Sequence, residues 1–390
     1  MKGYRRPDGR IGIRNHVAVI YTVECSRHVA DMIVRQTPGS DLIGFAGCYS
    51  DPYAFRMLVE VGRHPNVAAV LLVSLGCEST NLQQLASEIG TAGKRVETLV
   101  VQECGGTIKT IERGCVLAGA MVEEAHRIEP VPMTFSDLIV GVECGGSDTT
   151  SGLAANPAAG WAVDRLIDLG GTAIFSELPE LLGTEPYLVK RARTEEVAQS
   201  VRSGLERAQK LGQALGQFAI SVGNQLGGLT TIEEKSLGAL AKAGTKPIEG
   251  VLKTAERPSQ SGLYLLDKVG DVEGNQLGHY EINDSDGLIS LIASGAQLIF
   301  FTTGRGSVVG SAVSPVIKIC GNPNTCERLA DDIDIDAGTI ITGSATVADV
   351  GALIVDFTQA VINGRQTRSE SLGHKEYSIP YKPGRACDVG

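Results

Sequence analysis

The sequence predicts an α/β fold with parallel sheets, arranged in two domains. In the first third of the chain, apolar strands at 16–23, 66–73 and 96–101 alternate with segments whose apolar residues recur at helical spacing. Strands that are apolar throughout are buried on both faces, which is typical of parallel sheets covered by helices. With 390 residues, the chain is also long for a single hydrophobic core.

A proline-containing segment separates the two expected domains. Pro130 and Pro132 stand beside Arg127 and Glu129 and interrupt the alternation of strands and helices, as a domain linker does. We therefore expect a Rossmann-like N-terminal domain over 1–129 and a larger α/β C-terminal domain over 130–390. Further elements are expected in the second domain, as strands near 138–142, 172–175, 262–266, 297–301 and 316–319 and as helices over 194–215 and 347–361.

The composition argues against several classes of protein. The formal charge of −10, from 45 acidic and 35 basic residues, disfavours general binding to nucleic acids. No apolar run approaches the ~20 residues that cross a bilayer, and the N-terminus lacks the apolar core of a signal peptide. The nine cysteines are odd in number. Together these features predict a reduced, cytoplasmic protein rather than a disulfide framework.

Four cysteines follow predicted strands, each beside a glutamate. They are Cys25, Cys77, Cys104 and Cys144. Ligands of open α/β sheets bind beyond the carboxyl ends of parallel strands. These thiols are therefore candidate ligands for iron or another divalent metal, or for an iron–sulfur cluster. Cysteine is also a small buried hydrophobe, and this alternative stays open for each of them. We interpret Cys115, on a helix face, as a core residue, and Cys320, Cys326 and Cys387 as structural or incidental.

Two glycine-containing loops are candidate anion sites. The first contains Gly227, Gly228 and Thr230. It leads into a helix with Lys235, capped by Thr230 or Thr231, and a helix N-terminus favours a carboxylate. The second loop, 301–307, follows a strand and places Arg305 for a bidentate contact with a carboxylate. Tight structural turns explain both loops equally well.

Short motifs, in a fixed order along nearly the whole chain, resemble those of one known family. They occur at 3–10, 12–15, 25–26, 76–78, 143–148, 155–157, 174–177, 227–231, 234–238, 301–307 and 334–336. They resemble the large subunits of altronate and galactarate dehydratases. The resemblance implies loss of water from a sugar acid to give a 2-keto-3-deoxy acid, with Fe²⁺ or a similar divalent metal. Because the chain starts at the large-subunit motif, we also expect a separate small subunit, and an oligomer.

A sister group is the large subunit of sulfolactate sulfo-lyase, which eliminates sulfite. The runs 147–152, 231–235 and 373–377 are similar to that group. It lacks thiols at the positions of Cys25 and Cys77, so these thiols favour the dehydratase side. Dehydratases usually have a histidine four residues before the cysteine that matches Cys48, and a glycine after it. Gly44 and Tyr49 occupy these positions here, which leaves the substrate and the leaving group open.

The resemblance implies a β-elimination, in which a base removes the proton beside the carboxylate and a metal or acid assists the leaving group. The candidate catalytic residues are Lys235, His28 and Asp148, with Lys235 or His28 as the base. The expected metal ligands are Cys25, Cys48, Cys77, Cys144 and Glu177. The expected substrate-binding residues are Arg14, Asn15, Ser147, Gly227, Gly228, Thr230, Arg305 and Ser307. A non-catalytic paralogue that binds an organic acid, and a redox-sensing metal protein, remain alternatives.

Overall fold

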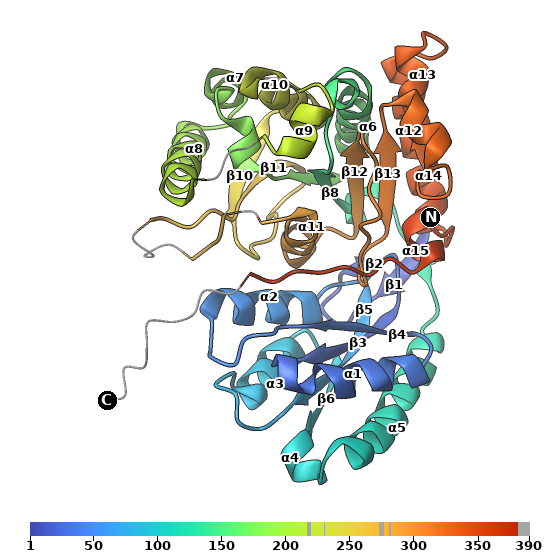
Figure 1. Cartoon of the computed structure of the whole chain (residues 1–390). Helices are drawn as coiled ribbons and strands as arrows, with labels where there is room; N and C mark the ends of the chain where they lie inside the picture. Colours follow the sequence, from blue (N-terminus) through green and yellow to red (C-terminus); the bar gives the residue numbers. More distant parts are fainter. Residues whose placement is uncertain (217–219, 230, 273–276, 281, 381–390) are drawn as a thin grey trace. The chain divides into compact units, whose positions relative to one another are not determined.

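The computed structural model describes residues 1–216, 220–229, 231–272, 277–280 and 282–380 (Figure 1). The chain forms two compact units. The small unit consists of Lys2–Met133 with the segment that begins at Tyr377, and the large unit is Thr134–Glu376. Among the described residues, no helix is both long and apolar enough to span a membrane.

The small unit contains a four-stranded parallel sheet in the order β4-β3-β5-β6. Its strands are β3 (His16–Tyr21), β4 (Ser40–Gly44), β5 (Val67–Ser74) and β6 (Arg95–Val100). The three strands that the sequence predicted are present, and β4 is an additional edge strand. Sequence periodicity missed β4 because Leu42 and Ile43 are its only large apolar residues.

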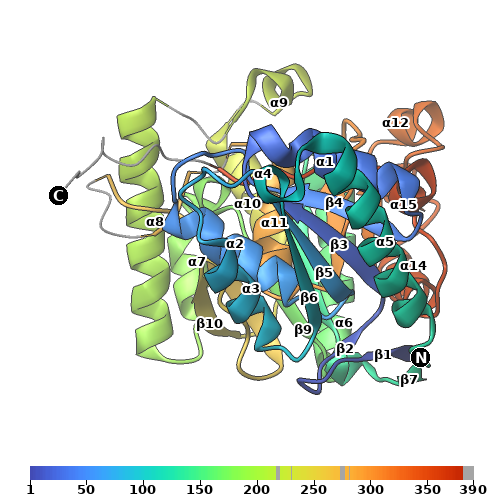
Figure 2. The same cartoon turned by 90° about the horizontal axis from the view of Figure 1, so that it is seen from below.

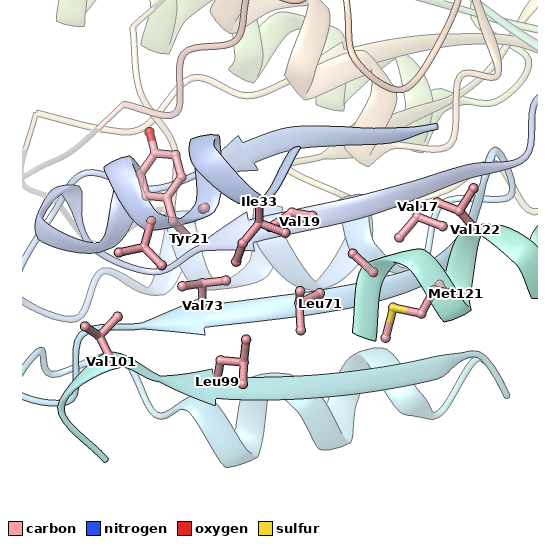
Figure 3. Packing of buried hydrophobic residues seen from close by; sticks show 14 of the residues in the cluster. Val17, Val19, Tyr21, Ile33, Leu71, Val73, Leu99, Val101, Met121 and Val122 are labelled. Atoms are coloured by element: carbon pink, nitrogen blue, oxygen red, sulfur yellow. The ribbon is translucent and has the colours of Figure 1, made fainter. Parts of the chain in front are cut away.

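Helices cover both faces of this sheet (Figure 2). They are α1 (Glu24–Gln36), α2 (Pro52–Gly62), α3 (Leu82–Gly90), α4 (Val101–Cys104) and α5 (Thr107–His126). Val19 of β3 and Leu71 of β5 are fully buried in one core with Ile33 of α1 and Met121 of α5 (Figure 3). Alternate residues of the strands point to the opposite face. There α2 and α3 pack together, with Ile89 directly against Gly62.

A second sheet of the small unit is short and antiparallel, in the order β2-β1-β7. Its strands are β1 (Lys2–Arg5), β2 (Ile11–Gly12) and β7 (Val131–Pro132). This sheet brings the two ends of the segment 2–133 together. The predicted linker around Pro130 and Pro132 therefore takes part in the small unit through β7.

The large unit is built on a seven-stranded parallel sheet in the order β10-β11-β9-β8-β12-β13-β14. Its strands are β8 (Ile139–Cys144), β9 (Thr172–Phe175), β10 (Ile248–Lys253), β11 (Gly262–Asp267), β12 (Leu298–Thr303), β13 (Val316–Cys320) and β14 (Ile335–Asp336). β8 lies at the centre, and Val140, Val142 and Phe300 are fully buried. The predicted α/β class with parallel sheets is thus confirmed.

The helices of the large unit connect these strands. They are α6 (Asn156–Asp168), α7 (Glu185–Lys190), α8 (Glu195–Leu215), α9 (Val222–Leu226), α10 (Ile232–Lys242), α11 (Asp284–Ala293), α12 (Pro323–Arg328), α13 (Gly338–Ile341), α14 (Val347–Ile362) and α15 (Arg368–Leu372). The expected helices over 194–215 and 347–361 are confirmed as α8 and α14. A capping box of Thr346 and Asp349 begins α14, which packs with α10 on α6.

Asp334 should make the stability of the large unit depend on pH. Its carboxylate oxygens accept the backbone N–H groups of Lys318 and Arg368, each at 2.9 Å. Burial raises the pKa of Asp334 from 3.8 to about 6, although these hydrogen bonds oppose the shift. The folded state therefore holds the proton more tightly than the unfolded chain. The stabilisation is present below the unfolded pKa of 3.8 and is lost as the pH rises through 6.

We expect this group alone to lower the free energy of unfolding by up to about 3 kcal/mol as the pH rises across that window. Chemical denaturation of the wild-type protein and of Asp334→Asn at several pH values within the window tests this. The amide cannot ionise, so any lost hydrogen bond adds a constant offset. The wild-type stability should fall relative to that of the variant as the pH rises, and a difference independent of pH would contradict the expectation.

Candidate active site

The large unit contains a buried cluster of charged groups around Cys144, the last residue of β8. The Cys144 thiol lies 3.1 Å from Glu177 Oε1 and 2.9 Å from Glu180 Oε2, as a donor to either carboxylate. The Nζ atoms of Lys235 and Lys242 each lie 3.4 Å from the same sulfur. Lys235 also pairs with Glu180 at 2.8 Å, and Lys242 pairs with Glu177. Two ammonium groups, two carboxylates and one thiol therefore meet in one place.

Both lysines come from one face of α10. They are seven residues apart, close to two helical turns, so their side chains point to the same side. Gly238 lies between them and approaches Gly152 closely, since a Cβ at position 238 would lie 3.1 Å from Gly152 Cα. The helix begins at a capping box of Thr231 and Glu234, one of the pairings that the sequence predicted. Helix periodicity and this close approach of α10 to Gly152 therefore place both ammonium groups beside Cys144.

Glu177 is held in a left-handed backbone conformation, with φ 73° and ψ 50°. For a residue other than glycine this conformation costs on the order of 1–3 kcal/mol. The side chain offsets the cost, because Glu177 Oε2 accepts the Cys144 backbone N–H at 3.1 Å and the carboxylate pairs with Lys242. Strained backbone of this kind concentrates at functional sites.

Burial governs the charge states in the cluster. The side chains of Lys242 and Lys235 are 0% and 3% exposed, whereas Glu180 is 18% exposed. Burial raises the pKa of the Cys144 thiol, reinforced by Glu180 and opposed by both lysines. Burial alone would lower the pKa of Lys235, but Cys144 and Glu180 outweigh it and hold that pKa above its usual range. Near neutral pH Lys235 is therefore an ammonium.

The cluster opens on a cavity of about 380 Å³ within the large unit. This volume is in the range of small-molecule sites. Cys144, Glu177 and Glu180 form part of its wall. The remaining lining residues are Gly145, Gly146, Pro179, Ser221, Asn224, Tyr280, Ile282, Asn283 and Asp284. The wall therefore offers hydroxyl, amide and carboxylate groups, which suit a ligand rich in hydroxyls.

Asp148, a predicted catalytic residue, is engaged by neighbouring loops. Its Oδ1 accepts from Thr150 Oγ1 at 2.6 Å and from the Ser151 N–H at 3.0 Å. Its Oδ2 accepts from Asn322 Nδ2 at 2.9 Å. The carboxylate is buried and fixes the loop that follows β8. These contacts support a positioning role for Asp148 beside the cluster.

The structure places three predicted substrate-binding residues, Ser147, Gly227 and Arg305, next to one another. Ser147 Oγ accepts from Lys235 Nζ at 2.6 Å. A Cβ at Gly227 would lie 3.1 Å from the Ser147 carbonyl oxygen and 3.2 Å from Arg305 Cδ, so these residues are packed together. Arg305 has an exposed side chain, and its backbone N–H donates to the Gly146 carbonyl at 3.0 Å. The two glycine loops that the sequence singled out therefore adjoin the loop of Cys144.

Gly304 allows this close packing, and alanine at this position should disrupt it. A Cβ at position 304 would lie 1.9 Å from Asp148 Oδ1 and 2.6 Å from Ser151 Oγ. We expect Gly304→Ala to lower the free energy of unfolding by about 1–3 kcal/mol, as overpacking does. Gly119→Ala is a matched control, because this helical glycine has no atom within 4 Å of the added Cβ. Denaturant titration checks both, and equal stabilities would argue against a tight contact.

The other predicted substrate-binding residues have different surroundings. Ser307 Oγ accepts the Val309 N–H at 3.2 Å, and Gly228 occupies a turn with φ 97°. Asn15 precedes β3 and lies at the amino edge of the small unit's parallel sheet, where its Nδ2 donates to Ala125 O at 2.5 Å. The side chain of the neighbouring Arg14 donates a hydrogen bond to the backbone carbonyl of Ile13. Thr230 lies outside the described residues.

The predicted ligands Cys25, Cys48 and Cys77 lie in the small unit, after β3, β4 and β5, and all three are exposed. Their loops meet at the carboxyl edge of the sheet, as expected for parallel strands, since the Ser79 N–H donates to Cys48 O at 2.9 Å. His28 is exposed on α1. The metal-binding and catalytic roles of these four residues stay predictions.

Two further cysteine assignments changed with the structure. Cys104 ends the short helix α4 rather than following β6 directly, because the chain turns into a helix at Val101. Cys115 is partly exposed on α5 and is not a core residue. Cys387 lies outside the described residues.

Within the part of the chain that the structure describes, one group of three candidate metal ligands lies within 4.8 Å: Cys144, Glu177 and Glu180. One thiolate and two carboxylates suit Fe²⁺ or another divalent transition ion. An iron–sulfur cluster uses several cysteines, and this group contains one. The donor set therefore fits a single ion, which would compete with Lys235 and Lys242 for the same carboxylates.

Sequence reasoning did not single out Glu180 or Lys242. The spacing of each residue from a predicted site residue is a signal that the sequence contains. Glu180 lies three residues after Glu177, and Lys242 lies seven residues after Lys235 on the same helix. A search for polar residues that share a face with a candidate would have found Lys242.

Models of two domains match the chain. The C-terminal domain of D-galactarate/altronate dehydratase matches residues 135–385, and the second domain of D-galactarate dehydratase/altronate hydrolase matches residues 3–126. The chain belongs to the galactarate/altronate dehydratase family. This membership confirms the resemblance found in the sequence motifs.

Individual relatives of this family span nearly the whole chain. The (2R)-sulfolactate sulfo-lyase subunit beta of Chromohalobacter salexigens is 33% identical, over 97% of this chain and 96% of the relative. The altronate dehydratase of Escherichia coli is 30% identical, over 98% of this chain and 77% of the relative. The altronate dehydratase of Bacillus subtilis is 32% identical, over 98% of this chain and 78% of the relative. These relatives are named as dehydratases or as a sulfo-lyase, and both kinds of enzyme are lyases. Lyase is also the enzyme class to which this chain belongs.

Proposed function

We propose that this protein is a hydro-lyase that removes water from a sugar acid of the altronate or galactarate type to give a 2-keto-3-deoxy acid. The observation that carries the proposal is the buried cluster of Cys144, Glu177, Glu180, Lys235 and Lys242 on a cavity of about 380 Å³. Family membership supports the reaction class, since dehydratases are among the relatives.

In the proposed reaction, Glu180 removes the proton beside the substrate carboxylate. Its carboxylate lines the cavity and is the most exposed charged group of the cluster. The Lys235 ammonium donates a proton to the departing 3-hydroxyl, which leaves as water, and the resulting enol becomes the 2-keto acid. Because its pKa is raised, Lys235 suits the role of acid and electrostatic stabiliser better than the role of base.

The remaining groups would position the substrate. Arg305 is exposed beside the Cys144 loop and is proposed to hold the substrate carboxylate, together with backbone N–H groups of the glycine loops. A divalent ion such as Fe²⁺ would be held by Cys144, Glu177 and Glu180, and would supply Lewis-acid polarisation of a substrate oxygen.

Sulfite elimination from sulfolactate is the second candidate. The sulfo-lyase subunit beta matches over 96% of its length, whereas the two altronate dehydratases match over 77% and 78% of theirs. Because that relative is named as a subunit, we also propose that this chain works with a second, smaller subunit.

A substrate screen with two readouts separates these reactions. The purified protein, prepared without oxygen and analysed for metal, is given hexonates, hexarates and sulfolactate, and 2-keto acid and sulfite are measured. Keto-acid release from a hexonate or hexarate supports the proposal, whereas sulfite release supports the alternative. Cys144→Ala should lower metal content and turnover, with the partly exposed Cys115→Ala as the control. Turnover that Cys144→Ala leaves unchanged would refute the assigned site.

A further inference from the structure

We propose that Cys320 and Cys326 form a reversible disulfide, and that its formation slows the reaction at the Cys144 site. The bond itself does not depend on the proposed function, whereas its effect on turnover rests on it. The two cysteines lie at the end of β13 and in α12, outside the cluster described above. They are free thiols in the structure.

The two cysteines are in contact. They belong to one buried cluster with Ile333, and Cys326 Sγ lies 3.5 Å from Cys320 O. A tight turn at Asn322 and Pro323 brings them together, with the Cys326 N–H donating to Asn322 O at 2.9 Å. Interaction with Cys326 lowers the pKa of Cys320, so the pair contains a thiol that ionises more readily than usual.

A small oxidant can approach this pair from one side. Cys320 is fully buried, and Cys326 is 8% exposed. Cys326 lines a cavity of about 290 Å³, together with Asp334 and Asp336. The cavity leads to Cys326, which packs against the buried Cys320. A cavity of this volume accommodates hydrogen peroxide.

The pair is mechanically connected to the loops beside the candidate active site. Cys320 Sγ lies 3.8 Å from Gly304 O, next to Arg305. Asn322, between the two cysteines, holds Asp148 Oδ2 at 2.9 Å. α12 also packs on the arginine loop, because a Cβ at Gly306 would lie 2.3 Å from Leu329 Cδ1 and 3.2 Å from Thr325 Cγ2. Closing the bond would therefore shift Asn322 and α12, on which the Asp148 and Arg305 loops depend.

The proposed chemistry uses hydrogen peroxide as the oxidant. One cysteine of the pair, as the thiolate, attacks one peroxide oxygen, the O–O bond breaks, and its sulfenic acid and hydroxide form. The sulfur of the other cysteine then attacks the sulfenic sulfur, the S–O bond breaks, and the sulfenic oxygen leaves as water. The protons of the two thiols end in water. In total, two thiols lose two electrons, and one peroxide becomes two waters.

Mass spectrometry of the full-length protein tests bond formation. The reduced protein is treated with hydrogen peroxide, alkylated and digested without reductant. We expect a peptide pair linked through Cys320 and Cys326 that dithiothreitol releases, and none in Cys320→Ser or Cys326→Ser. Separate oxidation of the two cysteines to sulfinic acids without a linked peptide would overturn the proposal.

Turnover tests the effect on the site. In the wild-type protein, peroxide should lower kcat by about tenfold or more, since small displacements of positioning groups have effects of this size, and dithiothreitol should restore it. Cys326→Ser should keep its basal activity and resist this reversible loss. A loss that persists in Cys326→Ser would belong to another site and would overturn the coupling. The linked peptide is measured without substrate, so failure of the proposed function cannot be mistaken for failure of the disulfide.

Discussion

Lys242→Met should lower the free energy of unfolding by about 3–5 kcal/mol, the range for breaking a buried ion pair by removing one partner. The Lys242 side chain is 0% exposed, and its ammonium pairs with Glu177 and contacts Cys144 Sγ at 3.4 Å. Methionine fills a similar volume but leaves the Glu177 carboxylate buried with less compensation. Denaturant titration measures the change, with circular dichroism to show that the variant folds.

Lys246→Met is the matched control for this prediction. Lys246 lies four residues further along the chain and pairs with Asp168, but its side chain is 28% exposed and that of Asp168 is 51% exposed. Surface pairs of this kind contribute about 0–1 kcal/mol, so the control should stay close to the wild-type stability. Equal effects of the two substitutions would show that burial of the Lys242–Glu177 pair is unimportant.

Lys235→Met should lower kcat/KM by about 10²–10⁴-fold, the range for loss of a positioned acid or base. The Lys235 ammonium contacts Cys144, Ser147 and Glu180 within the buried cluster. Methionine removes the proton donor and the positive charge together, and both are required when the hydroxyl departs and charge develops on the substrate. Steady-state kinetics with the substrate identified by the screen measures the loss.

The stability of Lys235→Met decides how its kinetics are interpreted. Activity is compared at a temperature at which denaturation shows the variant to be folded, and Lys246→Met again serves as the control. A folded variant with normal kcat would assign Lys235 to the structure of the cluster alone. A variant with normal kcat and a raised KM would assign it to substrate binding rather than to proton transfer.

These two predictions concern lysines of one helix with different surroundings. Lys242 is completely enclosed, whereas Lys235 pairs with Glu180, which reaches the cavity. We therefore expect stability to depend mainly on Lys242 and turnover mainly on Lys235. The separation follows from burial, because an enclosed charge stabilises its partner and a charge beside the cavity can act on a ligand.

Local sequence patterns were sufficient for most of the fold. β9 was predicted at 172–175 and spans Thr172–Phe175, and α8 was predicted over 194–215 and spans Glu195–Leu215. Both carry strong periodicity or a continuous apolar run. The edge strand β4 and the helix α4 at Cys104 do not, so neither was predicted. Their conformations depend on pairing with β3 and on the turn after β6.

The residues of the candidate site were also predicted only where a local sequence motif contains them. Cys144, Glu177, Ser147, Lys235 and Arg305 were named from sequence because each belongs to one of the motifs that resemble the family. Sequence alone also determined the family and the α/β class with parallel strands. These properties depend on residue type and spacing within short segments.

The tertiary structure decided which charges meet. Glu180 and Lys242 join Cys144 because β8, the turn at Glu177 and α10 converge, although they lie 36 and 98 residues from Cys144 in the chain. Only this packing removes water from the lysines, raises the pKa of the Cys144 thiol through burial, and brings Glu180 to Lys235, where it helps to hold the lysine pKa above its usual range. Burial and ion pairing are properties of distance in space, and spacing along the sequence does not specify them.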